Sequence, residues 1–306
     1  MTTGGKLFLI GAAVAVAGAG LLAAAGERTL GQVERNPTPA EPLGIGLLLA
    51  AIGVCLYVLQ PAFDERVAQR VPAASVRTAL AMLALVVIVG NLASLPLIAV
   101  FGSRALLAGG AGGQLGALGL IVGILASEVP LLGVVWLRLV RPGRFSWAQL
   151  GLREEAAWDV IPKGIGGGLG LWLLAALVSA ALIRLTGTQQ TQAERFAGIA
   201  HAPIGWFIAA LLAGCALAPL AEELFFRGYL FGLFRERWGR APAYIFSAGL
   251  FAVVHLNLPA MAPIFVLGLA LAYIYDRTGS LGPGMIAHGV NNLISFSLLY
   301  FIGLTS

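Results

Sequence analysis

Charged side chains are scarce in this 306-residue chain: Asp, Glu, Lys and Arg make up 11% of it, whereas a soluble domain carries roughly 25%. Hydrophobic residues make up 59%, and the mean hydropathy is +0.90. A water-soluble fold of this size could not bury so much apolar surface in one core. The apolar segments are long and do not alternate with polar residues, which favours spanning helices over a barrel. The sequence therefore predicts an all-α, polytopic bundle in a lipid bilayer.

Cysteine and lysine are nearly absent. Cys55 and Cys215 both lie in apolar runs, so the sequence offers neither a disulfide framework nor a Cys-x-x-Cys metal pair. The net charge of +5 comes from basic residues in short loops, where membrane-topology signals lie, and so does not predict a nucleic-acid partner. Arginine greatly outnumbers lysine, and alanine and glycine are abundant, which is typical of a GC-rich bacterial genome. We therefore expect a multi-pass protein of a bacterial plasma membrane.

Nine apolar segments are candidates for transmembrane helices. A helix needs about 20 residues to cross a hydrocarbon core of about 30 Å. The candidate segments lie near residues 7–25, 43–60, 79–101, 115–137, 165–186, 204–226, 242–258, 261–275 and 284–303. The eighth is short, and the sixth can continue as a helix towards Arg235. The first also fits a cleavable signal peptide, but its apolar stretch is long for one, so we favour a retained helix.

The distribution of basic residues predicts the orientation. Of nineteen Arg and Lys residues, Arg227 lies inside an expected span. With a cytoplasmic N-terminus, only five others fall on the outer side, namely Arg28, Arg35, Arg104, Arg184 and Arg195. The remaining thirteen then fall on the cytoplasmic side, where Lys and Arg concentrate in membrane proteins. This asymmetry supports nine spans with the N-terminus inside and the C-terminus outside.

The composition changes over residues 141–164, which are charged and hold Trp147 and Trp158. Ser146 and Gln149 have the spacing of a capping box for a short helix. We interpret 141–164 as an interfacial linker between N-terminal transmembrane helices of unknown role, 1–140, and a C-terminal domain, 165–306. The glycine run that ends the linker, Gly164–Gly168, predicts a close-packed helix start.

Few ionisable groups lie at membrane depth, and most are in the last 85 residues. They are Glu128, Glu222, Glu223, Arg227, His255 and His288. Each costs several kcal/mol in lipid unless it is paired or lies in a wet cavity, so such groups indicate function. At 1.5 Å per residue, Glu222 and His255 lie about 20 Å, and His288 about 13 Å, from the cytoplasmic ends of their helices. Three helices of alternating direction can therefore meet in one layer.

These residues form three motifs in order. Glu222 to Arg227 is an EExxxR motif, Phe251 to His255 is FxxxH, and His288 to Asn292 is HxxxN. Order and spacing over about 165–306 resemble the CPBP family (CAAX proteases and bacteriocin-processing enzymes, also called Abi), which are intramembrane proteases. Arg227-Gly228 and Thr278-Gly279-Ser280-Leu281 also look like the family.

Helix geometry and the resemblance assign the same roles. Glu223 and Arg227 are four residues apart and can form an ion pair. Glu222 is about 100° round the helix from Glu223 and so is less neutralised, as a general base requires. The resemblance implies that Glu222 and His255 orient the attacking water. His288 and Asn292, also four residues apart, would hold the oxyanion. Glu222, His255, His288 and Asn292 are thus the expected catalytic residues, supported by Glu223 and Arg227.

A zinc site is the alternative chemistry. Glu222, His255 and His288 form a His₂Glu set that can bind catalytic zinc. No HExxH helix is present. The family has long been labelled metalloprotease, but a metal-free glutamate mechanism is better supported, so we favour a site without metal or other cofactor.

Other polar and aromatic residues have simpler interpretations. We expect Glu128 to be a packing or cavity residue, with a supporting polar role as the alternative. His201 lies in an outer loop and is expected to be uninvolved. The aromatic cluster is expected to face lipid or core rather than substrate; it comprises Phe225, Phe226, Tyr229, Phe231 and Phe234.

The predicted activity is an intramembrane endopeptidase that hydrolyses a peptide bond of a membrane-associated peptide or protein. The prenyl-CAAX specificity is not carried over, because the expected bacterial source makes such substrates improbable. A non-catalytic membrane scaffold, such as a bacteriocin self-immunity protein, is the alternative. A transporter is disfavoured because no inverted repeat is visible. The sequence gives no prediction of substrate identity or oligomeric state.

Overall fold

The computed structural model describes residues 75–101, 114–187, 199–200, 202–257 and 260–303. The chain divides into two compact units, Met1–Ile88 and Val89–Ser306. Within the described ranges every regular element is a helix, which confirms the predicted all-α class there. The first two expected spans, the alternative signal peptide and His201 lie outside the described residues.

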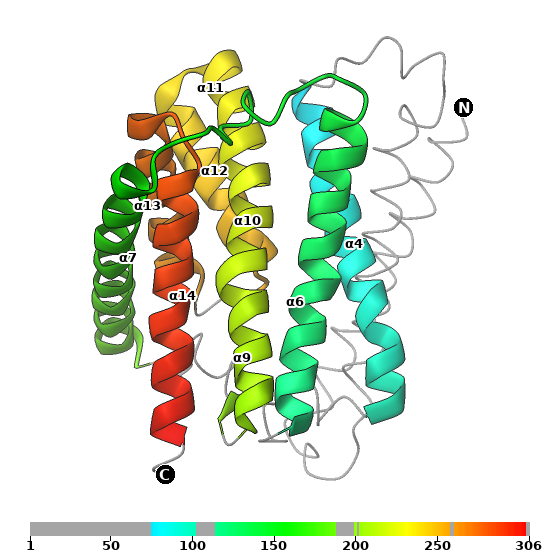
Figure 1. The fold of residues 1–306 in the computed structure, drawn as a ribbon, viewed down its shortest axis with the longest axis vertical. Helices are drawn as coiled ribbons and strands as arrows, with labels where there is room; N and C mark the ends of the chain where they lie inside the picture. The colour runs from blue at the N-terminus through cyan, green and yellow to red at the C-terminus, as the bar shows by residue number, and fades with distance from the viewer. Residues whose placement is uncertain (1–74, 102–113, 188–198, 201, 258–259, 304–306) are drawn as a thin grey trace. The chain divides into compact units, whose positions relative to one another are not determined.

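The described helices follow one another closely along the chain. They are α4 (Val76–Phe101), α6 (Gln114–Val135), η1 (Trp136–Val140), α7 (Ala157–Thr186), α9 (Ile204–Leu212), η3 (Ala213–Leu217), α10 (Ala218–Glu222), η4 (Glu223–Phe231), α11 (Gly232–Trp238), α12 (Arg240–Val254), α13 (Met261–Thr278) and α14 (Gly282–Gly303). The elements η1, η3 and η4 are π-helical turns. Elements α9 to α11 form one continuous helix, Ile204–Trp238, so the expected continuation towards Arg235 is confirmed (Figure 1).

Three helices in the described ranges are long and apolar enough to cross a membrane: Gly116–Val140, Ala157–Leu185 and Ile204–Trp238. Two shorter apolar helices are Val76–Gly90 and Arg240–Val254. Together with their composition, these helices identify the chain as an integral membrane protein. The nine-span count, the orientation and the domain boundaries stay predictions.

Helix α7 begins at Ala157, earlier than residue 165, where the fifth span was expected to begin. Asp159 lies in the first turn of α7, where a carboxylate is favourable beside the positive end of the helix. The Ser146–Gln149 capping bonds are both present, from Ser146 N–H to Gln149 Oε1 (2.8 Å) and from Gln149 N–H to Ser146 Oγ (3.2 Å). They close a single turn rather than the short helix that we predicted.

The other helix ends also differ slightly from prediction. Helix α12 ends at Val254, earlier than the predicted 258, and His255 caps it. A backbone bend follows directly, because Leu256 has a positive φ of 48°. The second motif's histidine thus ends its helix instead of lying inside it.

Helices α7 and α14 pack side by side, as Figure 1 shows. A Cβ atom added at Gly168 would lie 2.5 Å from Val290 Cβ, which is closer than two carbon atoms can approach. Glycine at this position therefore permits the close contact, as the Gly164–Gly168 run predicted. The opposite side of α7 exposes Leu169, Leu173 and Leu177, a stripe suited to lipid.

Candidate active site

The first motif lies where the long helix Ile204–Trp238 changes from α-helical to π-helical turns. Glu222 is the last residue of α10, and Glu223 is the first residue of η4. Such turns are rare in proteins and occur frequently at functional sites. Both Glu223 and Arg227 are 0% exposed. Two opposite charges are therefore held in the interior of a membrane helix bundle.

Glu223 and Arg227 form the predicted ion pair. Arg227 Nη1 donates to Glu223 Oε1 over 2.7 Å, and Arg227 Nη2 donates to the Gly268 carbonyl oxygen over 3.2 Å. The guanidinium carbon also lies 4.3 Å from the centre of the Phe251 ring. A buried charge is tolerable only with such partners, so these contacts fix Arg227 to α12 and α13.

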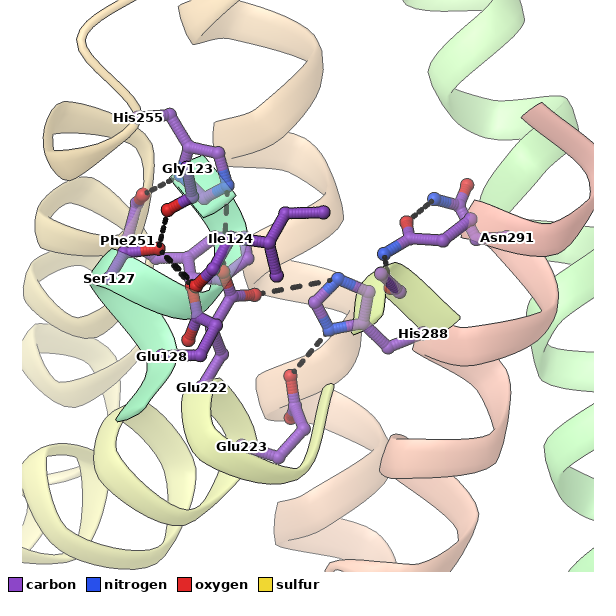
Figure 2. A network of polar contacts seen from close by, with 12 residues as sticks. Gly123, Ile124, Ser127, Glu128, Glu222, Glu223, Phe251, His255, His288 and Asn291 are labelled. Atoms are coloured by element: carbon purple, nitrogen blue, oxygen red, sulfur yellow. Dashed lines mark hydrogen bonds and ion pairs between the residues drawn. The ribbon is translucent and has the colours of Figure 1, made fainter. Parts of the chain in front are cut away.

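His288 lies between the two glutamates of the first motif (Figure 2). Its Nδ1 atom is 3.1 Å from Glu223 Oε1, and its Nε2 atom is 3.5 Å from Glu222 Oε2. An ionised Glu223 can only accept, so the Nδ1 atom carries the hydrogen in this contact. His288 can then donate from Nε2 only as a doubly protonated imidazolium.

His255 faces Glu222 from the end of α12. Its Nδ1 atom is 2.6 Å from the Phe251 carbonyl oxygen. A carbonyl oxygen only accepts, so Nδ1 carries a hydrogen, and Nε2 of the neutral ring is an acceptor. The Nε2 atom is 3.9 Å from Glu222 Oε1, beyond direct hydrogen-bond distance. The Nε2 atoms of both site histidines are thus directed at Glu222.

The two glutamates differ in their access to solvent. The Glu222 side chain is 13% exposed and the His255 side chain 22%, against 1% for Glu223. A base that activates water must be reached by water. Glu222, the expected base, is therefore the more exposed of the two glutamates, and Glu223, expected to be structural, is the more buried one. Sequence reasoning nevertheless missed that Glu223 also binds His288.

Asn292 follows His288 by one turn of α14, but its amide has other partners. Asn292 Nδ2 donates to the Gly214 carbonyl oxygen over 2.8 Å, and Asn292 Oδ1 accepts from Asn291 Nδ2 over 3.0 Å. In Figure 2, Asn291 lies on the far side of His288 from Glu222. One of the two Asn292 N–H groups is thus used to tie α14 to η3.

Glu128 of α6 joins the site from outside the three motifs. It is 6% exposed, and its Oε1 atom accepts from Ser127 Oγ over 2.8 Å. Helix α6 packs against α10, which ends at Glu222, and Figure 2 shows Glu128 on the Glu222 side of the site. Sequence analysis singled out Glu128 only because it is an ionisable residue at membrane depth. That position alone did not predict that Glu128 lies near Glu222.

The segment before α7 packs against the motif helices. Leu150 is fully buried, and a Cβ atom added at Gly228 would lie 2.5 Å from the Leu150 carbonyl oxygen. Leu281 N–H donates to the Gly151 carbonyl oxygen over 2.9 Å, and Ser280 Oγ bonds to Glu155. Gly228, Ser280 and Leu281, which lie next to the first motif and before the third, thus contact this segment. Sequence analysis identified the change in composition and the Ser146–Gln149 pair of this segment, but not its contacts with the motif helices.

The aromatic cluster of η4 and α11 is core, one of its two expected environments. Its five members are at most 2% exposed: Phe225, Phe226, Tyr229, Phe231 and Phe234. Their rings meet edge to face with neighbours, such as Phe226 with Phe251. This packing fixes the helix that carries the two glutamates.

The structure does not support a metal centre directly. Among the described residues, no group of three or more His, Cys, Asp or Glu side chains is arranged to hold a metal ion. The zinc site at Glu222, His255 and His288 stays the alternative interpretation. The expectation of a metal-free site stays a prediction.

Residues 204–294 match a family model described as type II CAAX prenyl endopeptidase Rce1-like. The UPF0177 protein YxdF of Lactococcus lactis subsp. lactis (strain IL1403) is 30% identical over 84 residues, which cover 27% of this chain and 46% of the relative. The uncharacterized protein YyaK of Bacillus subtilis (strain 168) is 33% identical over 98 residues, covering 29% and 32%. The UPF0177 protein YbdI of the same Lactococcus strain is 32% identical over 93 residues, covering 29% and 47%.

These matches confirm the predicted resemblance to the CPBP family for the segment that carries the three motifs. The matched family is a family of proteases, and these relatives are bacterial. The matched regions span less than half the length of each relative. No solved structure matches the chain.

Proposed function

We propose that this protein is an intramembrane endopeptidase that hydrolyses a peptide bond of a membrane-associated peptide or protein. One observation carries the proposal. Within the protease-like segment, the partly exposed Glu222 carboxylate is faced by the Nε2 atoms of His255 and His288, 3.9 Å and 3.5 Å away. A carboxylate beside two imidazoles can activate and orient a water molecule.

Glu222 acts as the general base. The attacking water gives one proton to Glu222 and directs its other hydrogen to Nε2 of neutral His255. Its oxygen forms a bond to the scissile carbonyl carbon, and the carbonyl π electrons move to oxygen, giving a tetrahedral oxyanion. When the carbon–nitrogen bond breaks, protonated Glu222 returns the proton to the leaving amine. Glu223 holds the Nδ1–H of His288, while Arg227 neutralises Glu223.

The oxyanion binds between His288 and Asn292. His288 donates from Nε2, and its Nδ1 atom is directed at Glu223. Asn292 donates the N–H that Gly214 does not use. No step requires a metal or another cofactor. Donors fixed before the reaction stabilise the transition state most effectively.

The wider architecture of the proposal follows the sequence. Nine spans place the N-terminus inside and the C-terminus outside a bacterial plasma membrane. Residues 1–140 form N-terminal transmembrane helices, 141–164 a linker and 165–306 the protease domain. Lipid and a membrane-associated substrate are the partners, and prenylated CAAX proteins are not the proposed substrates.

A non-catalytic scaffold or self-immunity protein is the competing function, because the same fold could be kept without chemistry. A deletion strain complemented with the wild-type gene or with Glu222→Gln separates the two. Membrane peptides are compared by mass spectrometry, and membrane levels of both proteins by immunoblotting. An intact peptide that accumulates with Glu222→Gln and disappears with wild type supports the protease. Equal complementation by both genes, at equal protein levels, supports the scaffold.

A further inference from the structure

The connection between α6 and α7 is placed at a membrane surface by the helices on either side of it (Figure 1). Gly116–Val140 and Ala157–Leu185 are both long and apolar enough to cross a membrane. In an integral membrane protein, the residues between two such helices lie at one face of the bilayer. Around this connection the side chains of Trp136, Trp147 and Trp158 are exposed, the last by 80%. Tryptophan is enriched where headgroups meet hydrocarbon, so we expect this region to contact lipid headgroups.

Three arginines are brought together where α6 ends. Arg138 lies in the π-helical turn η1, and Arg141 ends that turn, because its N–H donates to the Trp136 carbonyl oxygen over 2.7 Å. The chain then folds back, since the Leu139 carbonyl oxygen accepts from Arg144 N–H over 3.0 Å. Arg138, Arg141 and Arg144 are therefore carried by one compact turn of the backbone.

These three arginines are not neutralised within the part of the chain that the structure describes. There, no carboxylate lies within ion-pair distance of their guanidinium groups. The guanidinium carbon of Arg141 lies 5.7 Å from the centre of the Trp136 ring, a contact that needs no N–H donor. Arg235 and Arg240 differ, because they bind Asp276 over 2.7 Å and 2.6 Å. The turn after α6 thus keeps its charge for a ligand.

We propose that Arg138, Arg141 and Arg144, the arginine cluster, bind the phosphate of an anionic phospholipid headgroup. A guanidinium presents its N–H groups in a planar fork that fits phosphate oxygens. Three cations at headgroup level favour a lipid with a net negative charge over a zwitterionic lipid, whose own cation they repel. The exposed rings of Trp136 and Trp147 lie on the same segment and suit the apolar part of the lipid next to its phosphate. This inference is independent of the proposed function.

A headgroup bound at this turn is expected to stabilise the fold around the first motif. Phe145, which directly follows Arg144, packs edge to face on Tyr229, with the ring centres 5.8 Å apart. The Leu150 carbonyl oxygen lies against Gly228. Both contacts reach η4, which carries part of the first motif. A ligand that holds the turn in place therefore raises the melting temperature, and this effect is measured without any substrate.

The test uses the purified full chain in a nonionic detergent, with phosphatidylglycerol or phosphatidylcholine of the same acyl chains added. Native mass spectrometry counts the bound lipids and gives their affinity, and scanning fluorimetry gives the melting temperature. We expect phosphatidylglycerol to bind more tightly and to raise the melting temperature by about 5 °C, and phosphatidylcholine to have a much smaller effect. Equal binding and equal stabilisation by the two lipids would overturn the proposal.

The decisive comparison is between two triple variants that lose the same charge. The first removes the arginine cluster, and the matched control removes three exposed arginines elsewhere. One arginine near anionic lipid contributes about fivefold in affinity, so the first variant should bind phosphatidylglycerol about 100-fold more weakly than wild type. The control should bind it as wild type does. Equal affinities of the two triple variants would refute the proposed site. The first variant combines Arg138→Gln, Arg141→Gln and Arg144→Gln, and the control combines Arg184→Gln, Arg237→Gln and Arg277→Gln.

Two further measurements complete the test. Arg144→Gln alone changes one exposed side chain, so it is available if the triple variant does not fold. It should weaken phosphatidylglycerol binding about fivefold, and an unchanged affinity would contradict the proposal. Glycerol phosphate, a soluble anion with the same phosphate group, separates a lipid site from a site for free phosphate. It should not stabilise the wild-type chain at the concentrations used for the lipid. If it raises the melting temperature as much as phosphatidylglycerol does, the site binds free phosphate and the lipid proposal fails.

Discussion

Two long apolar helices, α7 and Ile204–Trp238, show how differently a membrane helix can be used. The two helices have nearly equal mean hydropathy, 2.0 and 2.1. In the most apolar 18-residue stretch of each, however, 11% of the first and 39% of the second is buried inside the structure. The first is a regular α-helix that exposes leucines such as Leu173 and Leu177. The second contains π-helical turns and holds Glu222, Glu223 and Arg227. Hydropathy alone therefore does not distinguish a helix with exposed leucines from one with buried charged residues.

The difference lies in what surrounds each helix. Charges in the second helix are supported by partners from α12, α13 and α14, including Gly268, Phe251 and His288. A charge without such partners would cost several kcal/mol in lipid. The helix with charged residues must therefore be the one that other helices enclose. We expect the two helices to respond differently to substitution.

The largest effect on stability is expected from Glu223→Gln. It leaves the fully buried Arg227 without its counter-charge, and breaking a buried ion pair costs about 3–5 kcal/mol. We expect a large fall in melting temperature and, as a consequence, lower activity. The matched control is Arg184→Gln, which removes an exposed charge from α7 and should leave the melting temperature nearly unchanged. Equal melting temperatures for Glu223→Gln and wild type would contradict the account.

The next effect concerns the oxyanion donors. His288→Ala should lower kcat about 10²–10³-fold, as does loss of an oxyanion-hole donor in other enzymes. Asn292→Ala should cause a similar loss, and it should also lower the melting temperature because the bond to the Gly214 carbonyl oxygen is lost. Initial rates over a range of substrate concentrations separate kcat from KM. A change confined to KM for both variants would show that these residues bind substrate without stabilising the transition state.

A smaller effect distinguishes two glycines in the two helices. In Gly228→Ala the new Cβ would lie 2.5 Å from the Leu150 carbonyl oxygen, so backbone must move. We expect a loss of about 1–3 kcal/mol in the free energy of unfolding. At Gly170 of α7 nothing lies within 4 Å of the added Cβ. Gly170→Ala should therefore be neutral or stabilise by about 0.5–1 kcal/mol. The two variants would refute this comparison if they melted at the same temperature.

Much of the site could be predicted because membrane burial makes charges rare and informative. The Glu223–Arg227 pair followed from helical spacing, and His288 and His255 were expected near Glu222 from their motifs and depth. The segment that matches the family model, residues 204–294, contains all of these residues. Side-chain polarity in an apolar run is a local signal, so one sequence is sufficient to detect it.

Other features depend on contacts that are distant in sequence. The π-helical turns at Glu223 have no simple sequence signature, so the helix was treated as ideal. The early start of α7 depends on residues that are polar enough to resemble a linker. Contact between Leu150 and Gly228 joins segments 78 positions apart and has no periodic signal. The environment of Glu128 likewise became visible only when α6 was placed beside α10.

The most direct test of the central claim is peptide cleavage by purified Glu222→Gln in detergent, with melting temperature recorded beside wild type. Glutamine keeps the shape of Glu222 and removes the base. The account predicts loss of nearly all cleavage and a melting temperature close to that of wild type, with wild-type activity unaffected by chelators. Normal cleavage by Glu222→Gln would contradict the claim that this carboxylate activates water. If Glu223→Gln were also fully folded and inactive while Glu222→Gln cleaved normally, the roles of the two glutamates would be reversed.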